Sequence, residues 1–164
     1  MQPSITAILS LAEIFDNLTQ TQFELVASIC EPQTCKKGDV LLRENDNSDE
    51  MYVIGRGGVE ILVTPGFAGS NSDQEPLVLT ELRQGQIFGE MALVDEGVRS
   101  ATARISRNDT MVLRIRRHRL LLLCDTYPEL GYKIMRNLAV DLALKIRNTD
   151  LTLRQYQLML SNNK

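Results

Sequence analysis

Hydrophobic residues recur at spacings of three and four along residues 4–30, and this spacing places side chains on one face of a helix. The pattern predicts two short helices, the second of which Thr19 or Thr21 could cap. The hydrophobic positions are Ile5, Ile8, Leu9, Leu11, Ile14, Phe15, Leu18, Phe23, Leu25, Val26 and Ile29.

Between residues 35 and 115 the pattern changes to short runs rich in β-branched residues, separated by glycine and asparagine. Such runs predict the strands of an antiparallel β-barrel or jelly roll. In one run Val59, Ile61 and Val63 share a side, so these three are expected to face the interior. Residues 65–76 have the composition of a surface loop. The predicted strands are 40–43, 51–54, 59–64, 77–82, 100–105 and 111–115.

Residues 116–126 suit a third helix, and a long helix is predicted to start at Pro128. Hydrophobic residues continue along the long helix at alternating spacings of three and four, which is typical of a coiled-coil seam. We expect this seam to join two copies of the chain in a parallel homodimer. The alternative is that the stripe packs on the barrel of its own chain. The seam residues are Ala139, Leu142, Ile146, Thr149, Leu153, Tyr156 and Leu160.

Composition and charge limit the classes of function. A chain of 164 residues, 43% of them hydrophobic, can form one sizeable core, so a single domain over 1–164 is expected. A net charge of −3 argues against direct nucleic-acid binding. Membrane-span and signal-peptide patterns are missing, so we expect a cytoplasmic protein. The three cysteines lack the spacing of a metal or redox site; we expect them to be reduced, with no bound metal or cofactor.

Residues 85–105 combine a glycine, a carboxylate and an arginine at close spacing. Gly89 permits close backbone approach, and the helix-forming residues after it can start a turn whose free N–H groups point at an anion. Arg99 adds a charge whose fork geometry matches phosphate oxygens. Glu90 only accepts hydrogen bonds, so it suits a sugar hydroxyl beside that anion. The set indicates a nucleotide whose phosphate folds back on its own ribose.

Phe-Gly-Glu-Met-Ala-Leu at 88–93 and Arg-Ser-Ala-Thr at 99–102 resemble the phosphate-binding cassette of the cyclic nucleotide-binding domain family. Residues 37–46 and 51–61 look like the first strands of that family's barrel. The resemblance implies an α+β fold, in which an antiparallel β-barrel (a jelly roll, or double-stranded β-helix) is flanked by N-terminal helices and a long C-terminal helix. The implied parts are N-terminal helices at 1–34, a barrel at 35–115 with the cassette at 88–102, and a hinge and long helix at 116–164.

The same resemblance implies a role for each matching residue. Arg99 would pair with the exocyclic phosphate oxygens, and Glu90 would accept a hydrogen bond from the ribose 2′-hydroxyl. Ser100 and Ala101 would complete the phosphate cradle. The remaining implied contacts are backbone donors or close approach at Gly89, Met91 and Ala92, and a base pocket lined by Ile61, Leu79 and Thr80.

Both charged residues also have a purely structural alternative. Arg99 could be a surface residue paired with Asp95 or Glu96, and Glu90 could cap its own helix. Their occurrence together, inside the two matching motifs, favours the ligand role.

The resemblance favours cAMP over cGMP as the ligand. Relatives that prefer cGMP often have a threonine directly after the arginine, whereas the Arg-Ser-Ala of 99–101 is the form of cAMP-binding bacterial regulators. In those regulators a Thr-Ser pair on the long helix contacts the adenine amino group, but Lys145 and Ile146 stand there in this chain. Lys145 cannot accept a hydrogen bond, although Asn148 or Thr149 could substitute after a small shift in register.

The expected function is a non-enzymatic cyclic-nucleotide sensor that moves its C-terminal helix on binding and acts on a protein partner. No helix-turn-helix sequence follows the long helix, so a stand-alone module or a fragment is expected rather than a direct DNA-binding regulator. The alternative is an adaptor that keeps the barrel for dimerisation and binds no nucleotide. A phosphodiesterase is not expected, because one histidine and no carboxylate cluster leave nothing to bind a catalytic metal.

Overall fold

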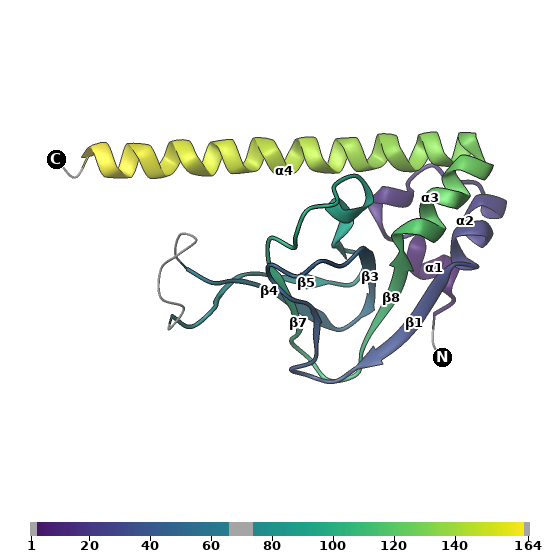
Figure 1. The fold of residues 1–164 in the computed structure, drawn as a ribbon, viewed down its shortest axis with the longest axis horizontal. Coiled ribbons are helices and arrows are strands. Elements are labelled where there is room, and N and C mark those ends of the chain that lie inside the picture. Colours follow the sequence, from purple (N-terminus) through teal and green to yellow (C-terminus); the bar gives the residue numbers. More distant parts are fainter. Residues whose placement is uncertain (1–2, 66–73, 163–164) are drawn as a thin grey trace.

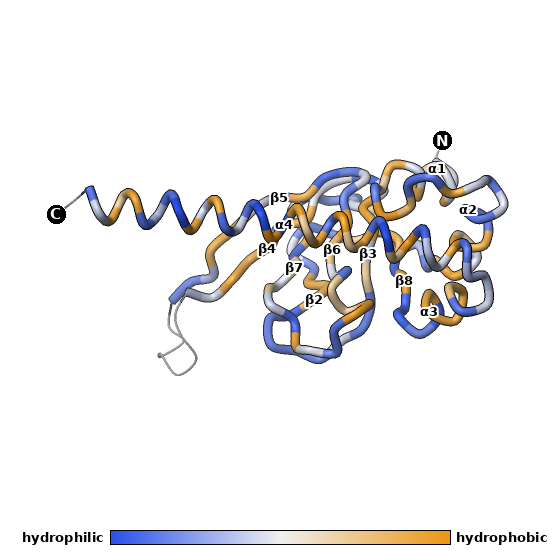
Figure 2. Tube along the Cα trace, turned by 90° about the horizontal axis from the view of Figure 1, so that it is seen from above, coloured by the Kyte–Doolittle hydropathy of each residue, from blue (hydrophilic) through white to orange (hydrophobic). Residues whose placement is uncertain are grey.

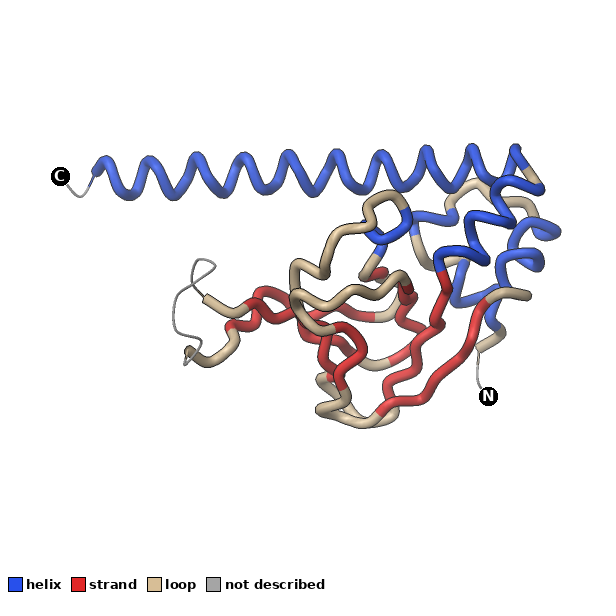
Figure 3. Tube along the Cα trace, viewed as in Figure 1, coloured by secondary structure: helices blue, strands red, loops and turns tan. Residues whose placement is uncertain are grey.

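The structure, a computed structural model, describes residues 3–65 and 74–162, so most of the expected loop at 65–76 lies outside the described residues. Three short helices gather at one end of a set of strands, and the last helix runs from that end across the strands and beyond them (Figures 1 and 3). The helices are α1 (Ile5–Leu9), η1 (Glu13–Phe15), α2 (Gln20–Ala27), η2 (Glu90–Leu93), α3 (Arg117–Thr126) and α4 (Pro128–Asn162). The strands are β1 (Cys30–Cys35), β2 (Val40–Leu42), β3 (Glu50–Arg56), β4 (Gly58–Val63), β5 (Leu77–Arg83), β6 (Ile87–Phe88), β7 (Thr102–Ile105) and β8 (Thr110–Arg116).

The strands form two antiparallel sheets of four, in the orders β1-β8-β3-β6 and β2-β7-β4-β5. The expected α+β class and jelly-roll-like arrangement are therefore found, but the closed barrel is not found among the described residues. No strand of one sheet pairs with a strand of the other in the described part of the chain. Side chains from both sheets instead meet in one hydrophobic cluster, which includes Leu42, Tyr52, Ile54, Val59, Phe88, Ala103, Ile105 and Val112.

The sheet that contains β3 and β8 is buried on both faces. Tyr52 and Ile54 pack toward the other sheet, whereas the alternate residues Met51 and Val53 pack against the helices. The residues on the helix side form a second hydrophobic cluster, which contains Met51, Val53 and the fully buried Phe15. The helices therefore share one core with the sandwich, and the position of α4 is tied to that core.

One strand, β1, is not among those that the sequence predicts. The expected boundary places residues 1–34 in helices, but β1 starts at Cys30 and pairs with β8 along its whole length. Pro32 lacks an N–H group, and such a residue is tolerated in an edge strand such as β1. In the preceding helix the structure selects Thr19 as the cap: its hydroxyl accepts from Gln22 N at 3.2 Å, and Gln22 Oε1 accepts from Thr19 N at 2.9 Å.

A β-bulge changes the pairing of β4 with β5 and the expected position of Leu79. The register passes from Ile61↔Thr80 to Leu62↔Val78, so Leu79 is an extra residue on β5. Before the bulge Val59 is buried as predicted and Ile61 packs against the core between the sheets. Beyond it Val63, which is expected to face the interior, is half-buried and lies outside the core between the sheets, whereas Leu62 is buried, with only 3% of its surface exposed.

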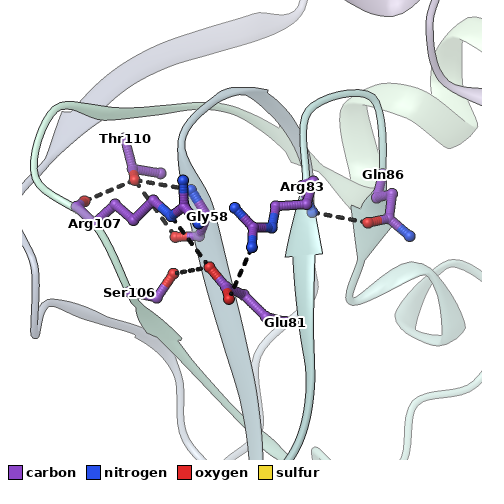
Figure 4. Close-up of polar contacts among 7 residues, drawn as sticks. All are labelled: Gly58, Glu81, Arg83, Gln86, Ser106, Arg107 and Thr110. Atoms are coloured by element: carbon purple, nitrogen blue, oxygen red, sulfur yellow. Dashed lines mark hydrogen bonds and ion pairs between the residues drawn. The ribbon is translucent and has the colours of Figure 1, made fainter.

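Glu81 fixes β5 to its neighbours outside the core. Its carboxylate accepts from Ser106 Oγ at 3.0 Å and from Arg107 Nε at 3.3 Å, and Arg83 reaches its other oxygen at 3.2 Å (Figure 4). The hydrogen bond from Ser106 and the two arginines lower the pKa of this carboxyl. The network holds the strand that also carries Thr80, the residue just before Glu81.

The 35 residues of α4 fall into a docked part and a protruding part. Leu130, Ile134 and Leu138 are buried in the helix-side core, and Asn137 Nδ2 donates to the backbone oxygens of Ile14 at 3.0 Å and Asp16 at 2.9 Å. The rest of the helix extends past the sandwich (Figure 1). No helix in the described ranges is long and hydrophobic enough to cross a bilayer.

The three cysteine thiols are free, and each is buried or half-buried. Burial raises the pKa of Cys30 to about 12 and also raises the pKa of Cys35 and Cys124. A thiol with a raised pKa is a poor nucleophile at neutral pH, so the structure supports their interpretation as small hydrophobic residues.

Candidate nucleotide site

Gly89 forms the sharp turn between β6 and the short helix η2. Its φ of +77° is a left-handed conformation that L-residues with side chains rarely adopt. A Cβ atom at this position would lie 2.8 Å from the backbone oxygen of Glu50 and 3.1 Å from Arg99 Nη1. Glycine is therefore required both by the backbone and by the close approach of Arg99. The turn that follows begins with N–H groups that have no partner within the turn, which suits an anion.

Arg99 is buried, with 7% of its surface exposed, and its guanidinium is held in place on three sides. Nε donates to Ser48 Oγ at 2.8 Å, Nη1 donates to Gly89 O at 3.1 Å and Nη2 donates to Glu50 O. Among the described residues these bonds use three of its five N–H groups, which leaves two for a ligand. Burial lowers the pKa of Arg99, while Glu50 acts in the opposite direction; arginine nevertheless stays charged in proteins.

Arg99 does not form the surface ion pair with Asp95 or Glu96 that the sequence also allowed. Glu96 pairs with Arg117 instead, and Asp95 accepts a hydrogen bond from Gly97 N. The basic run around Arg117 is partly neutralised as well, because Arg114 and Arg116 both pair with Glu31. Arg99 is thus directed to the cassette rather than paired with a surface carboxylate.

Glu90 is the first residue of η2, and only 6% of its surface is exposed. Its carboxylate receives a hydrogen bond from Lys145 on α4, which also lies 2.9 Å from Asp141 Oδ2. A buried carboxylate is costly without a partner, and in this structure α4 supplies that partner.

A cavity of about 550 Å³ opens between the cassette, the sheet that contains β4 and β5, and α4. It is lined by every residue that the sequence assigns to the ligand except Leu79. The bulge explains this exception, because Leu79 is the extra residue on β5 and 62% of its surface is exposed. The nine residues that do line the cavity are Ile61, Thr80, Gly89, Glu90, Met91, Ala92, Arg99, Ser100 and Ala101.

Other lining residues are absent from the sequence-based assignment. Asp141 and Lys145 enter the cavity from α4, and Gln84 and Gln86 enter from the turn between β5 and β6. The spacing of four between Asp141 and Lys145 is the one signal that could have paired them in advance. Groups of three or more potential metal ligands do not occur among the described residues.

The fold and the cavity together define a ligand-binding domain with a jelly-roll-like sandwich, a buried arginine and a covering helix. The chain belongs to the cyclic nucleotide-binding domain family, whose model matches residues 32–127. The match is to a binding module, which is regulatory rather than catalytic.

Individual relatives agree with this assignment. The chain is 29% identical over 140 residues to the cyclic AMP receptor protein of Thermus thermophilus, covering 85% of this chain and 60% of that protein. It is 28% identical over 117 residues to human cGMP-dependent protein kinase 2, covering 71% of this chain but 15% of the kinase. The crystal structure of Thermus thermophilus catabolite activator protein superposes with a TM-score of 0.75 at 28% identity, covering 89% of this chain and 63% of that one. The chain thus spans only part of the length of these relatives.

Proposed function

We propose that this domain is a non-enzymatic sensor of a cyclic purine nucleotide, cAMP in preference to cGMP, that changes the position of α4 and thereby acts on a protein partner. The observation that carries the proposal is the cavity, because it places a buried, fixed guanidinium and a buried carboxylate in one space large enough for a nucleotide. Free, buried thiols suit the reducing cytoplasm, where we expect the domain to work.

In the proposed complex, Arg99 binds the cyclic phosphate with its remaining N–H groups, beside the N–H groups at the start of η2. Glu90 accepts a hydrogen bond from the ribose 2′-hydroxyl. Ser100 and Ala101 close the phosphate end, and the base lies toward Ile61 and Thr80, the paired residues of β4 and β5. Leu79 has no part in this arrangement.

The preference for cAMP rests on the cassette sequence. Ser100 follows Arg99 where many relatives that prefer cGMP have threonine. The names of the relatives favour neither nucleotide, because one is a cyclic AMP receptor protein and another is a cGMP-dependent protein kinase.

Isothermal titration of the protein with cAMP and with cGMP tests the proposal. We expect a micromolar or lower dissociation constant for cAMP and a higher one for cGMP, with acyclic 5′-AMP as the control ligand that binds much more weakly. Tighter binding of cGMP would reverse the proposed preference. No heat and no thermal shift with either cyclic nucleotide would refute the sensor and favour the adaptor.

We further propose that two copies of the chain pair through the protruding part of α4. Hydrophobic residues continue along this part among polar ones, and they cover no core of their own chain (Figure 2). Exposed hydrophobic surface of this extent is typical of an interaction site. The seam residues concerned are Ile146, Leu153, Tyr156 and Leu160, which are 62%, 56%, 62% and 70% exposed.

Sedimentation velocity tests the pairing. The unaltered protein is expected to sediment as a dimer, and the double variant Leu153→Asp, Tyr156→Asp as a monomer, because each aspartate would bury a charge in the seam. Gln155→Asp, which adds one such charge off the seam, serves as the control and should remain dimeric. A monomeric unaltered protein at high concentration would contradict the pairing.

A further inference from the structure

Lys145 joins two parts of the molecule that lie far apart in the sequence. Its ammonium group donates to Glu90 Oε1 in the cassette, 55 positions earlier, and lies 2.9 Å from Asp141 Oδ2 one turn back on α4. The side chain of Glu90 is 8% exposed, whereas that of Lys145 is 50% exposed. The buried carboxylate therefore depends on a cation delivered from the solvent-facing helix.

Asp141 holds Lys145 in this position. It lines the same cavity, and its side chain is 23% exposed, so it stands beside the Glu90 contact rather than in bulk solvent. Burial acts to lower the pKa of Lys145, but the hydrogen bonds with Glu90 and Asp141 outweigh it, so the pKa lies above its ordinary value. The ammonium is consequently charged at neutral pH and shared between two carboxylates.

We propose that Lys145 is a built-in competitor of the ribose, because it already bonds Oε1 of the Glu90 carboxylate, the group that the 2′-hydroxyl of the nucleotide would use. The inference rests on the proposed function and adds a residue that determines how strongly the site selects for ribose. An ammonium bonds a carboxylate more strongly than a neutral hydroxyl does, so an arriving 2′-hydroxyl gains little from Glu90 while Lys145 remains there.

The competition also links the cavity to the helix. Whenever the 2′-hydroxyl takes the carboxylate, α4 loses its ion pair with the cassette and keeps the hydrophobic contacts and the Asn137 hydrogen bonds of its docked part. Ribose binding and the Lys145–Glu90 ion pair therefore oppose each other, because both use the same carboxylate as acceptor. In this structure the pair ties α4 to the cassette, and a 2′-hydroxyl that takes the carboxylate would weaken that contact.

A thermodynamic cycle with two ligands and two proteins tests the inference. The dissociation constants of cAMP and 2′-deoxy-cAMP are measured by isothermal titration for the unaltered protein and for Lys145→Met. In the unaltered protein the loss of the 2′-hydroxyl should change affinity by no more than about threefold, because Lys145 keeps Glu90 satisfied. In Lys145→Met the same loss should cost about tenfold or more, because it leaves a buried carboxylate without a partner.

Arg147→Met is the matched control, since it removes the same charge from the same helix at an exposed residue that does not line the cavity. Its ratio of the two dissociation constants should equal that of the unaltered protein. Lys145→Gln, which keeps an N–H donor but no charge, should give an intermediate ratio and provides a second variant if Lys145→Met folds poorly.

The outcomes separate the two proposals. A ratio that stays the same or falls in both Lys145 variants, while cAMP still binds, would overturn the competition and leave the sensor intact. Failure of the unaltered protein to bind either nucleotide would refute the sensor, and the competition with it. A second measurement needs no nucleotide: amide hydrogen exchange at residues 140–148 of the empty protein should be faster in Lys145→Met than in Arg147→Met.

Discussion

Replacing Arg99 with glutamine is expected to weaken cAMP binding by about 100-fold, because removing one partner of a buried, hydrogen-bonded charge pair typically costs about 2–5 kcal/mol. Each factor of ten in affinity corresponds to about 1.4 kcal/mol. The effect should be large here, since Gly89, Ser48 and Glu50 hold the guanidinium in place before the ligand arrives. A pre-organised donor loses little entropy on binding. Isothermal titration of the variant measures the change.

Arg104→Gln is the control for this experiment. Arg104 lies on β7, a few residues after the cassette, and its half-exposed side chain pairs with Glu60 outside the cavity. The substitution removes the same charge but should leave cAMP affinity within about twofold, as exposed ion pairs contribute little. Equal affinities of Arg99→Gln and the unaltered protein would show that the phosphate binds elsewhere.

Truncating Phe15 to alanine is expected to lower the free energy of unfolding by about 3–5 kcal/mol. Phe15 ends η1, has no exposed surface, and belongs to the cluster in which the docked residues of α4 meet β3 and β8. The lost side chain leaves a cavity at the point where the helices, the sheet and α4 share one core. Guanidinium denaturation followed by circular dichroism gives the change.

Leu122→Ala serves as the comparison for Phe15→Ala. Leu122 is on α3 with 66% of its surface exposed, so its truncation should change the stability by no more than about 0.5 kcal/mol. Similar losses in the two variants would mean that η1 is not part of the shared core.

Periodicity was sufficient to predict the elements whose burial is regular. The helix after β8, the break at Tyr127 and the long helix from Pro128 follow the sequence closely. Most strands of the sandwich also lie within a few residues of their predicted ranges. In these segments one pattern of hydrophobic positions is compatible with only one kind of element.

Elements that depend on a neighbour could not be predicted in this way. The strand β1 has the sequence Cys-Glu-Pro-Gln-Thr-Cys, in which no hydrophobic alternation is visible, and it is a strand because β8 lies beside it. The two-residue β6 is equally invisible, and the bulge at Leu79 depends on how β4 and β5 pair. The extra residue on β5 explains the position of Leu79, whereas the half-buried position of Val63 on β4 has no explanation in the strand pairing.

The residues of the site also fall into a group that the sequence predicts and a group that depends on how the helix packs. The residues of the cassette are close in sequence, so one motif predicts that Gly89, Glu90 and Arg99 belong to one site. In the structure all three line the same cavity. The contribution of α4 was not predictable, because it depends on how the helix docks and rotates. The sequence shows only that Lys145 departs from the family's pattern; the docked helix shows that it reaches Glu90.

The edges of the two sheets also bear on how the protein behaves at high concentration. An exposed strand edge is a template for other chains and so a risk of aggregation. β1 carries Pro32, which has no N–H group to donate, and β2 and β6 are too short to recruit a long partner. The long hydrophobic edge β5 is interrupted by its bulge at Leu79. Each edge thus carries a feature that opposes strand addition, and concentrated solutions should not form cross-β aggregates while the sandwich is folded.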